Sequence, residues 1–127
     1  MENEFLKLIE TRRSCRKYQS KQITYEELNA VLRAGTFAPT GMGQQSPYIV
    51  AVQQDKMKEK LAAMNAAVRG KSGNPYYDAP TYVLVFAPTD CPFAIQDGTC
   101  VLENMMLAAH AIGLASCWIN RETEMFA

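Results

Sequence analysis

Apolar residues recur every three or four positions near the start of the chain, which is the spacing of one face of an α-helix. They predict a first helix over residues 3–11 and a second helix that ends before Pro39. Thr24 and Glu27 form a capping-box pattern at the start of the second helix. The inward-facing residues of the two helices are predicted to be Phe5, Leu8 and Ile9, then Leu28, Val31 and Leu32.

Two later stretches predict strands. Residues 48–53 are short, apolar and β-branched, which is typical of a buried strand, and residues 81–87 form the clearest strand in the chain. Between them, Asp55 is expected to cap a helix that has Gly70 just beyond its end. The core-facing residues of that helix are predicted to be Met57, Leu61, Met64 and Val68.

The last third of the chain completes the predicted architecture. A helix over residues 97–112 is apolar nearly all round, so we expect it to be buried on most sides. Residues 115–119 predict a third strand, and Asn120 is a candidate cap for one further helical turn. Alternating helices and strands predict an α+β fold or a related mixed α/β layering, with residues 1–127 as a single domain.

Composition limits the kind of protein this is. The 127 residues are 48% hydrophobic, enough for one core, and 13 basic side chains balance 13 acidic ones. No net field therefore favours nucleic acid or a membrane surface. The four cysteines lack zinc-site spacing, and the N-terminus lacks the features of a signal peptide. We expect a soluble protein of the reducing cytoplasm without a metal site.

One short stretch concentrates positive charge where the first helix ends. This arginine turn, residues 11–18 (TRRSCRKY), carries Arg12, Arg13 and Arg16, with the Ser14 hydroxyl between them. Guanidinium groups suit phosphate because they donate bidentate, charge-assisted hydrogen bonds. Alternatively, the arginines complement the negative end of the helix dipole and extend into solvent. The turn by itself leaves both interpretations open.

A second candidate site is the glycine loop, residues 38–47 (APTGMGQQSP). Gly41 and Gly43 would let the backbone approach a flat ligand closely, while Thr40 and Gln45 offer polar groups. Loops of this composition are also common as plain turns. The chain has neither a Rossmann glycine fingerprint nor a P-loop, so a nucleotide would be held in another way.

Four stretches, taken in order, resemble the nitroreductase family of flavin-dependent oxidoreductases over nearly the whole chain. They are RRSCRKY, APTGMGQQSP, NPYYDAPTYVLVFA and DGTCVLENMMLAAHAIGLASCWINR. The resemblance implies a nitroreductase-like fold, in which helices wrap a central mixed sheet around a buried core helix. It also implies a homodimer with FMN bound at the subunit interface.

The resemblance assigns roles within the arginine turn. Arg12 and Ser14 would grip the FMN phosphate and ribityl chain, with Arg13 close by. Arg16 would lie near the pyrimidine edge of the flavin, where a cation stabilises the negative charge that reduction builds.

The glycine loop and the last predicted strand supply the other implied contacts. Residues 39–42 would pack on the flavin from the partner subunit, with Gln45 ordering that loop, and backbone groups of Ile119 and Asn120 would face the reactive N5 edge. Trp118 either stacks near the ring or anchors the strand end. The full implied cofactor set is Arg12, Arg13, Ser14, Arg16, Pro39, Thr40, Gly41, Met42, Gln45, Trp118, Ile119 and Asn120.

The chain also departs from the family pattern. Gly43 stands where many relatives have Asn, and Ser46-Pro47 replaces a frequent Pro-Trp, so fewer side-chain contacts are expected there. The family pattern continues after residue 127 with a helix, a strand that crosses to the partner, and basic residues that complete the phosphate grip. We therefore expect a C-terminally short version of the domain.

The implied activity needs no catalytic side chain. Flavin would accept hydride from NADH or NADPH and pass two electrons to a nitroaromatic, quinone or similar flat acceptor, by ping-pong kinetics at one site. The alternative is a flavin-binding or structural remnant without turnover. The sequence leaves the acceptor and the choice of nicotinamide open.

Other reactive residues are expected to be structural. His110 is the only histidine and lacks a second ligand nearby, which indicates a satisfied, partly buried side chain. Cys117 is expected to pack as a small apolar group. Asp97 and Glu103 have the wrong spacing to share a helix face, so no paired-carboxylate mechanism is predicted.

Overall fold

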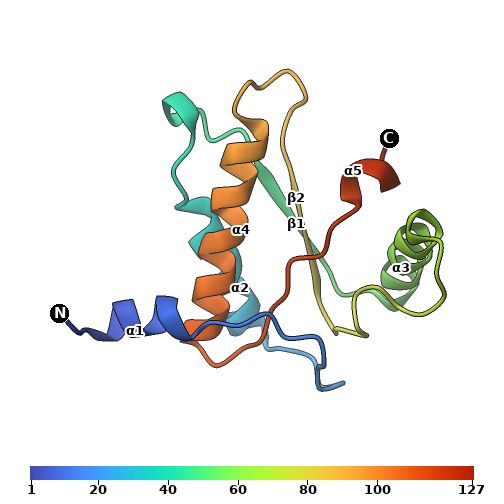
Figure 1. Ribbon diagram of the computed structural model, residues 1–127, viewed down its shortest axis with the longest axis horizontal. Coiled ribbons are helices and arrows are strands. Elements are labelled where there is room, and N and C mark those ends of the chain that lie inside the picture. Colours follow the sequence, from blue (N-terminus) through green and yellow to red (C-terminus); the bar gives the residue numbers. More distant parts are fainter.

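The computed structural model describes residues 1–127, in which a pair of long helices packs against a small sheet (Figure 1). The mixed helix and strand content confirms the predicted α+β class. In chain order the elements are α1 (Glu4–Thr11), α2 (Tyr25–Thr36), the 3-10 turn η1 (Gly41–Gly43), β1 (Tyr48–Val52), α3 (Asp55–Arg69), β2 (Tyr82–Phe86), α4 (Ala94–Ala111) and α5 (Glu122–Met125).

Helix starts follow local side-chain chemistry. The predicted capping box is present at α2: the Glu27 amide donates to Thr24 Oγ1 at 3.1 Å, and the Thr24 amide donates to Glu27 Oε2 at 2.8 Å. The prediction that Asp55 caps α3 is wrong. Gln54 occupies the cap position without a side-chain bond, and Asp55 is the first helical residue, where its carboxylate pairs with Lys58 at 3.3 Å.

The sheet consists of β1 and β2 in antiparallel register, with Tyr48 opposite Phe86 and Val52 opposite Tyr82. Side chains alternate between its two faces. Ile49 and Val85 point to one face and pack against a core cluster built by α2 and α4. The sheet is therefore the divider between that cluster and a second one.

The second cluster covers only one end of the opposite face. Val52 and Tyr82 pack there with Leu61 of α3 and Met125 of α5. At the other end Tyr48 is 57% exposed, so the prediction that the whole of β1 is buried is wrong. The cluster that α3 and α5 build lies at the Val52 end, whereas at the Tyr48 end the chain after α5 contributes the ring of Phe126, which packs edge-on against Phe86.

The core of the larger cluster lies between α2 and α4. Val101, Met105 and Ala109 of α4 are buried, but the prediction that this helix is buried on most sides is wrong, because its buried residues form a single stripe along one side. The helix begins at Ala94, three residues earlier than expected. Gly35 lets α2 approach closely, because an added Cβ would lie 2.9 Å from Met105 Cγ. None of the helices has both the length and the apolar character needed to cross a membrane.

The predicted third strand over residues 115–119 is wrong. Only one parallel bridge forms there, between Ser14 and Ser116, and the Cys15 amide donates to the Ser116 carbonyl at 2.9 Å. Residues 117–121 run on without a neighbouring strand to pair with. The bridge nevertheless fixes the arginine turn beside the segment that follows α4.

Candidate active site

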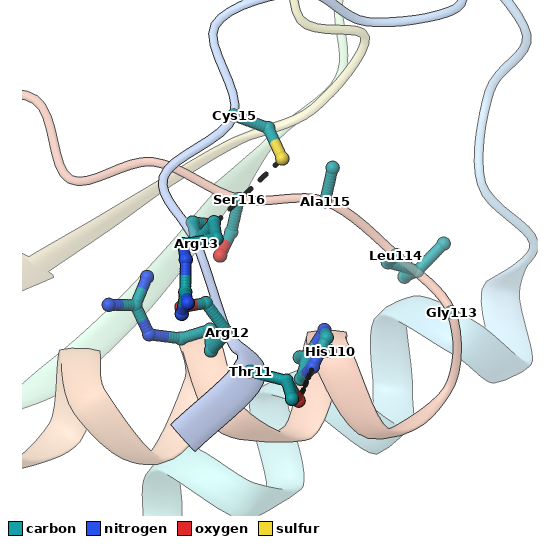
Figure 2. Close-up of a pocket in the computed structure, with 9 residues that line it drawn as sticks. All are labelled: Thr11, Arg12, Arg13, Cys15, His110, Gly113, Leu114, Ala115 and Ser116. Atoms are coloured by element: carbon teal, nitrogen blue, oxygen red, sulfur yellow. Dashed lines mark hydrogen bonds between the residues drawn. The ribbon is translucent and has the colours of Figure 1, made fainter. Parts of the chain in front are cut away.

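The arginine turn begins where α1 stops. Thr11 is the last helical residue, and Arg12 leaves the helix with φ −58° and ψ 138°, which directs the chain across the end of α4. A cavity of about 360 Å³ lies between this turn and the chain from His110 to Ser116 (Figure 2). Charged groups of the turn therefore border a hollow rather than a flat surface.

The arginines of the turn differ in what they contact. Arg13 folds back, and its Nη1 donates to the carbonyls of Glu10 and Arg12, both at 2.8 Å, as expected for a cation that caps a helix end. Arg12 is different, because its Nη1 is shielded from solvent and has no acceptor. Arg16 is exposed.

No carboxylate neutralises this charge. The one ion pair in the chain joins Lys58 to Asp55 on α3, and no arginine takes part in an ion pair. A buried guanidinium nitrogen without an acceptor is costly, so a site of this kind favours an anion. A phosphate oxygen would supply the acceptor that the Nη1 of Arg12 lacks within the chain.

His110 closes one side of the cavity. Its Nε2 lies 2.9 Å from Thr11 Oγ1, and that hydroxyl already donates to the Lys7 carbonyl at 2.7 Å (Figure 2). The Nε2 of His110 is therefore the donor in the contact with Thr11. The expectation of a satisfied, partly buried histidine is confirmed, and its role is to tie α1 to the end of α4.

Tyr18 ends the arginine turn as a neutral hydroxyl. Its OH donates to the Cys15 carbonyl at 2.5 Å. Burial raises the pKa of Tyr18 to about 12, and the nearby thiols of Cys117 and Cys15 add to the shift. At neutral pH the hydroxyl therefore keeps its proton and holds the turn closed.

The segment after the bridge, residues 117–121, presents a row of unused backbone donors and will be called the amide segment. The amides of Ile119, Asn120 and Arg121 donate to no atom of the chain. Trp118 is 44% exposed, whereas Ile119 is half-buried. Together with β2 and α4, the segment borders a mostly apolar groove of about 1040 Å³.

The glycine loop is anchored by a residue that sequence reasoning had set aside. The Gly41 amide donates to Asp97 Oδ1 at 2.8 Å, and Asp97 is only 3% exposed. Inside the loop, the Gln45 amide donates to Thr40 Oγ1 at 2.9 Å. The signal for Asp97 was an acidic residue in the first turn of an otherwise apolar helix, where a carboxylate can hold a passing loop.

Gly41 and Gly43 serve different purposes. An added Cβ at Gly41 would lie 2.3 Å from Phe93 Cδ2, so the chain's own aromatic ring accounts for that glycine. Gly43 has φ +64° and open space around it. Its neighbour Met42, at the tip of the loop, is 85% exposed. Close approach of a ligand therefore remains an explanation for the loop tip and not for Gly41.

The predicted site residues fall into two groups at opposite ends of α4 (Figure 1). The arginine turn and the amide segment lie at the C-terminal end, near His110, and the glycine loop is tied to Asp97 at the N-terminal end. A rise of about 1.5 Å per residue puts about 20 Å along this 18-residue helix between Asp97 and His110. Pro39, Thr40, Gly41, Met42 and Gln45 therefore do not share a pocket with the arginines of the same chain.

This architecture is that of an α+β protein with an arginine-lined cavity at the end of its first helix. The model of the nitroreductase family matches residues 9–121, and the chain belongs to the nitroreductase family. A nitroreductase with bound FMN from Bacteroides fragilis is 35% identical, with a TM-score of 0.84, over 98% of this chain and 77% of that one. Another from Desulfitobacterium hafniense is 28% identical, with a TM-score of 0.83, over 91% and 69%.

Curated relatives extend the same picture. The FMN reductase (NAD(P)H) of Bacillus subtilis is 28% identical over 122 residues, which is 89% of this chain and 47% of the relative. A protein of Methanothermobacter thermautotrophicus, provisionally named NADH dehydrogenase/NAD(P)H nitroreductase, is 29% identical over 119 residues. That match covers 91% of this chain and 60% of the relative, so the chain spans less than two thirds of each of these two proteins.

Proposed function

We propose that residues 1–127 are a flavin-binding domain of an FMN-dependent oxidoreductase that carries two electrons from NADH or NADPH to a flat acceptor, such as a nitroaromatic or quinone. The observation that carries the proposal is the uncompensated, partly shielded guanidinium of Arg12, in a cavity that shares residues 113–116 with the groove bordered by the free amides. An FMN phosphate suits the first feature, and the acceptor atoms of a flavin edge suit the second. The FMN-bound structures of relatives support the choice of cofactor.

Each part of the chain has a proposed role toward FMN. Arg12 and Ser14 hold the phosphate end, while Arg13 keeps the turn in shape through its contacts with the helix end. Arg16 is free to lie by the pyrimidine edge, and the backbone of Ile119 and Asn120 serves the N5 edge. Bound FMN supplies the two-electron chemistry, and the chain binds and orients it.

The remaining proposed contacts come from a second copy of the chain. The glycine loop lies about 20 Å along α4 from the arginine turn, too far to serve the same ring within one chain. We propose a homodimer in which residues 39–42 of one subunit pack on the flavin held by the arginine turn of the other, with Gln45 keeping that loop in order. Trp118 belongs to the amide segment and lines the apolar groove. We propose that it contacts the flavin ring or the acceptor.

A ping-pong cycle follows from one exposed flavin face, at which nicotinamide and acceptor would bind in turn. Initial rates at several fixed acceptor concentrations would then give parallel double-reciprocal lines. Intersecting lines would refute the shared site. A protein that binds FMN but is not bleached by NADH or NADPH without oxygen would favour the alternative, a flavin-binding module without turnover.

Arg12→Gln tests the phosphate contact. A hydrogen bond to a charged group contributes about 1.5–3 kcal/mol, so the variant is expected to bind FMN roughly tenfold or more weakly in a fluorescence titration. Arg33→Gln is the matched control, because Arg33 lies on α2 and stacks on Phe37 at 5.7 Å, away from the turn. Equal affinities for the two variants would contradict the assignment of Arg12.

A further inference from the structure

The amide segment is held from behind by one buried side chain. Asn65 of α3 is 0% exposed, and its Nδ2 donates to the Asn120 carbonyl at 3.0 Å. Its Oδ1 accepts from Arg121 Nε at 2.8 Å. The same amide group also donates to the Tyr76 hydroxyl at 3.4 Å. Asn65 thus grips two consecutive residues of the segment, one through its backbone and one through its side chain.

The grip explains an unusual backbone conformation. Arg121 has φ +85°, in the left-handed region that residues with side chains rarely adopt. Such a conformation persists only where the surroundings determine it. The bond from Arg121 Nε to Asn65 and the bond from Asn65 to the Asn120 carbonyl supply that constraint on both sides of the peptide.

The consequence is a defined direction for the Arg121 amide, because the N–H of a trans peptide points opposite to the carbonyl of the same peptide, here that of Asn120. The Asn120 carbonyl is turned toward α3 and satisfied there, whereas the amides of Ile119, Asn120 and Arg121 have no acceptor in the chain. A row of backbone donors that is fixed in advance binds the acceptor atoms of a planar heteroaromatic edge without a cost of ordering. Donors on a loosely held loop would lose part of their binding free energy to that ordering.

We propose that Asn65 is the positioning residue for these amides, so that the segment recognises the acceptor edge of a flavin through a conformation set by α3. The inference rests on the proposed function for the identity of the ligand, and on the hydrogen bonds of Asn65 for the mechanism. Asn65 lies behind the segment and does not touch the ligand. No sequence motif marks it, because it is a single polar residue on the inner face of a helix.

The segment contains its own reporter, since Trp118 is the only tryptophan of the chain. Time-resolved anisotropy of Trp118, measured without FMN, reports how firmly the segment is held. Asn65→Leu removes the two hydrogen bonds to the segment, and the one to Tyr76, at similar side-chain size. Asn65→Asp keeps an acceptor for Arg121 but places an oxygen against the Asn120 carbonyl. Both variants are expected to add a fast local motion that lowers the residual anisotropy.

Asn104→Leu is the matched control. Asn104 donates to the Ala34 carbonyl at 3.0 Å, the same bond type and length, but it joins α4 to α2 away from the segment. The control is expected to leave the Trp118 anisotropy unchanged and FMN affinity within about twofold. Loss of one well-placed hydrogen bond predicts FMN binding about threefold to tenfold weaker in the Asn65 variants.

The outcomes separate the inference from the proposed function. Unchanged Trp118 motion in the Asn65 variants would overturn the inference, whatever happens to FMN. Loosened Trp118 motion in the Asn65 variants, together with a wild-type chain that binds no FMN, would leave the positioning role in place and refute the flavin. If Asn65→Leu does not fold, Asn65→Asp decides, and failure of both would assign Asn65 a purely structural role and overturn the proposal.

Discussion

The carboxylate of Asp97 is the anchor of the glycine loop, and its removal should destabilise the protein by a calculable amount. Asp97 is 3% exposed, and Oδ1 accepts the Gly41 amide at 2.8 Å. A hydrogen bond to a charged group contributes about 1.5–3 kcal/mol, and an acid in the first turn of a helix adds about 0.3–1 kcal/mol. The second oxygen, Oδ2, is buried without a partner, which offsets part of this gain.

Asp97→Ala is therefore expected to lower the free energy of unfolding by about 2–3 kcal/mol. For a chain of this length, about 4 °C of melting temperature corresponds to 1 kcal/mol, so the expected drop is about 8–12 °C. Asp97→Asn keeps an acceptor for the Gly41 amide and loses only the charge, with an expected drop of about 4 °C. Circular dichroism during thermal unfolding measures both.

Asp55→Ala is the matched control for this experiment. Asp55 is also an acid in the first turn of a helix, but its side chain is 87% exposed and its partner is Lys58. A pair of this kind contributes about 0–1 kcal/mol, so the control should melt within about 2–4 °C of wild type. If Asp97→Ala melts no lower than Asp55→Ala, the carboxylate does not hold the loop and the reasoning is refuted.

Three further changes test other parts of the fold. Burial raises the pKa of Glu122, so the free energy of unfolding falls as pH rises from the usual pKa of a glutamate through the raised value. Glu122→Gln should therefore raise the urea midpoint at pH 7 and leave it unchanged at pH 4. Gly35→Ala forces a Cβ to 2.9 Å from Met105 Cγ and should cost about 1–3 kcal/mol in urea unfolding, unless Met105 moves aside. His110→Ala removes the bond to Thr11 and should cost about 1 kcal/mol, with faster hydrogen exchange confined to α1.

Elements governed by local chemistry were predictable from the sequence. The capping box of α2, the left-handed Gly70 after α3 and the apolar run of β2 all depend on residues within a few positions of one another. Features set by tertiary neighbours were not. Residues 115–119 have the composition of a strand, but only Ser116 finds a pairing partner, and half of β1 lacks a covering helix.

The candidate site shows the same division. Charge concentrated in the arginine turn was visible in the sequence, but its individual roles depend on where each guanidinium ends, as the contrast between Arg13 and Arg12 shows. Asp97 and Asn65 were not identifiable as site residues, because their partners lie 55 or more positions away in the chain. A polar residue on an apolar helix face was the only available signal for either.

The length of α4 constrains any model of how this family member holds a flavin. The helix is buried along one side, and the distance of about 20 Å along it from Asp97 to His110 is a fixed property of the chain. The arginine turn is pinned at one end by the Thr11–His110 contact and the Ser14–Ser116 bridge, and the glycine loop is pinned at the other by Asp97. A ligand that contacts both groups in one pocket therefore needs two chains. Bound FMN and the dimer should then be lost together. Dilution that separates subunits should release FMN in parallel; retention of FMN by a monomer would show that the arginine turn and amide segment suffice.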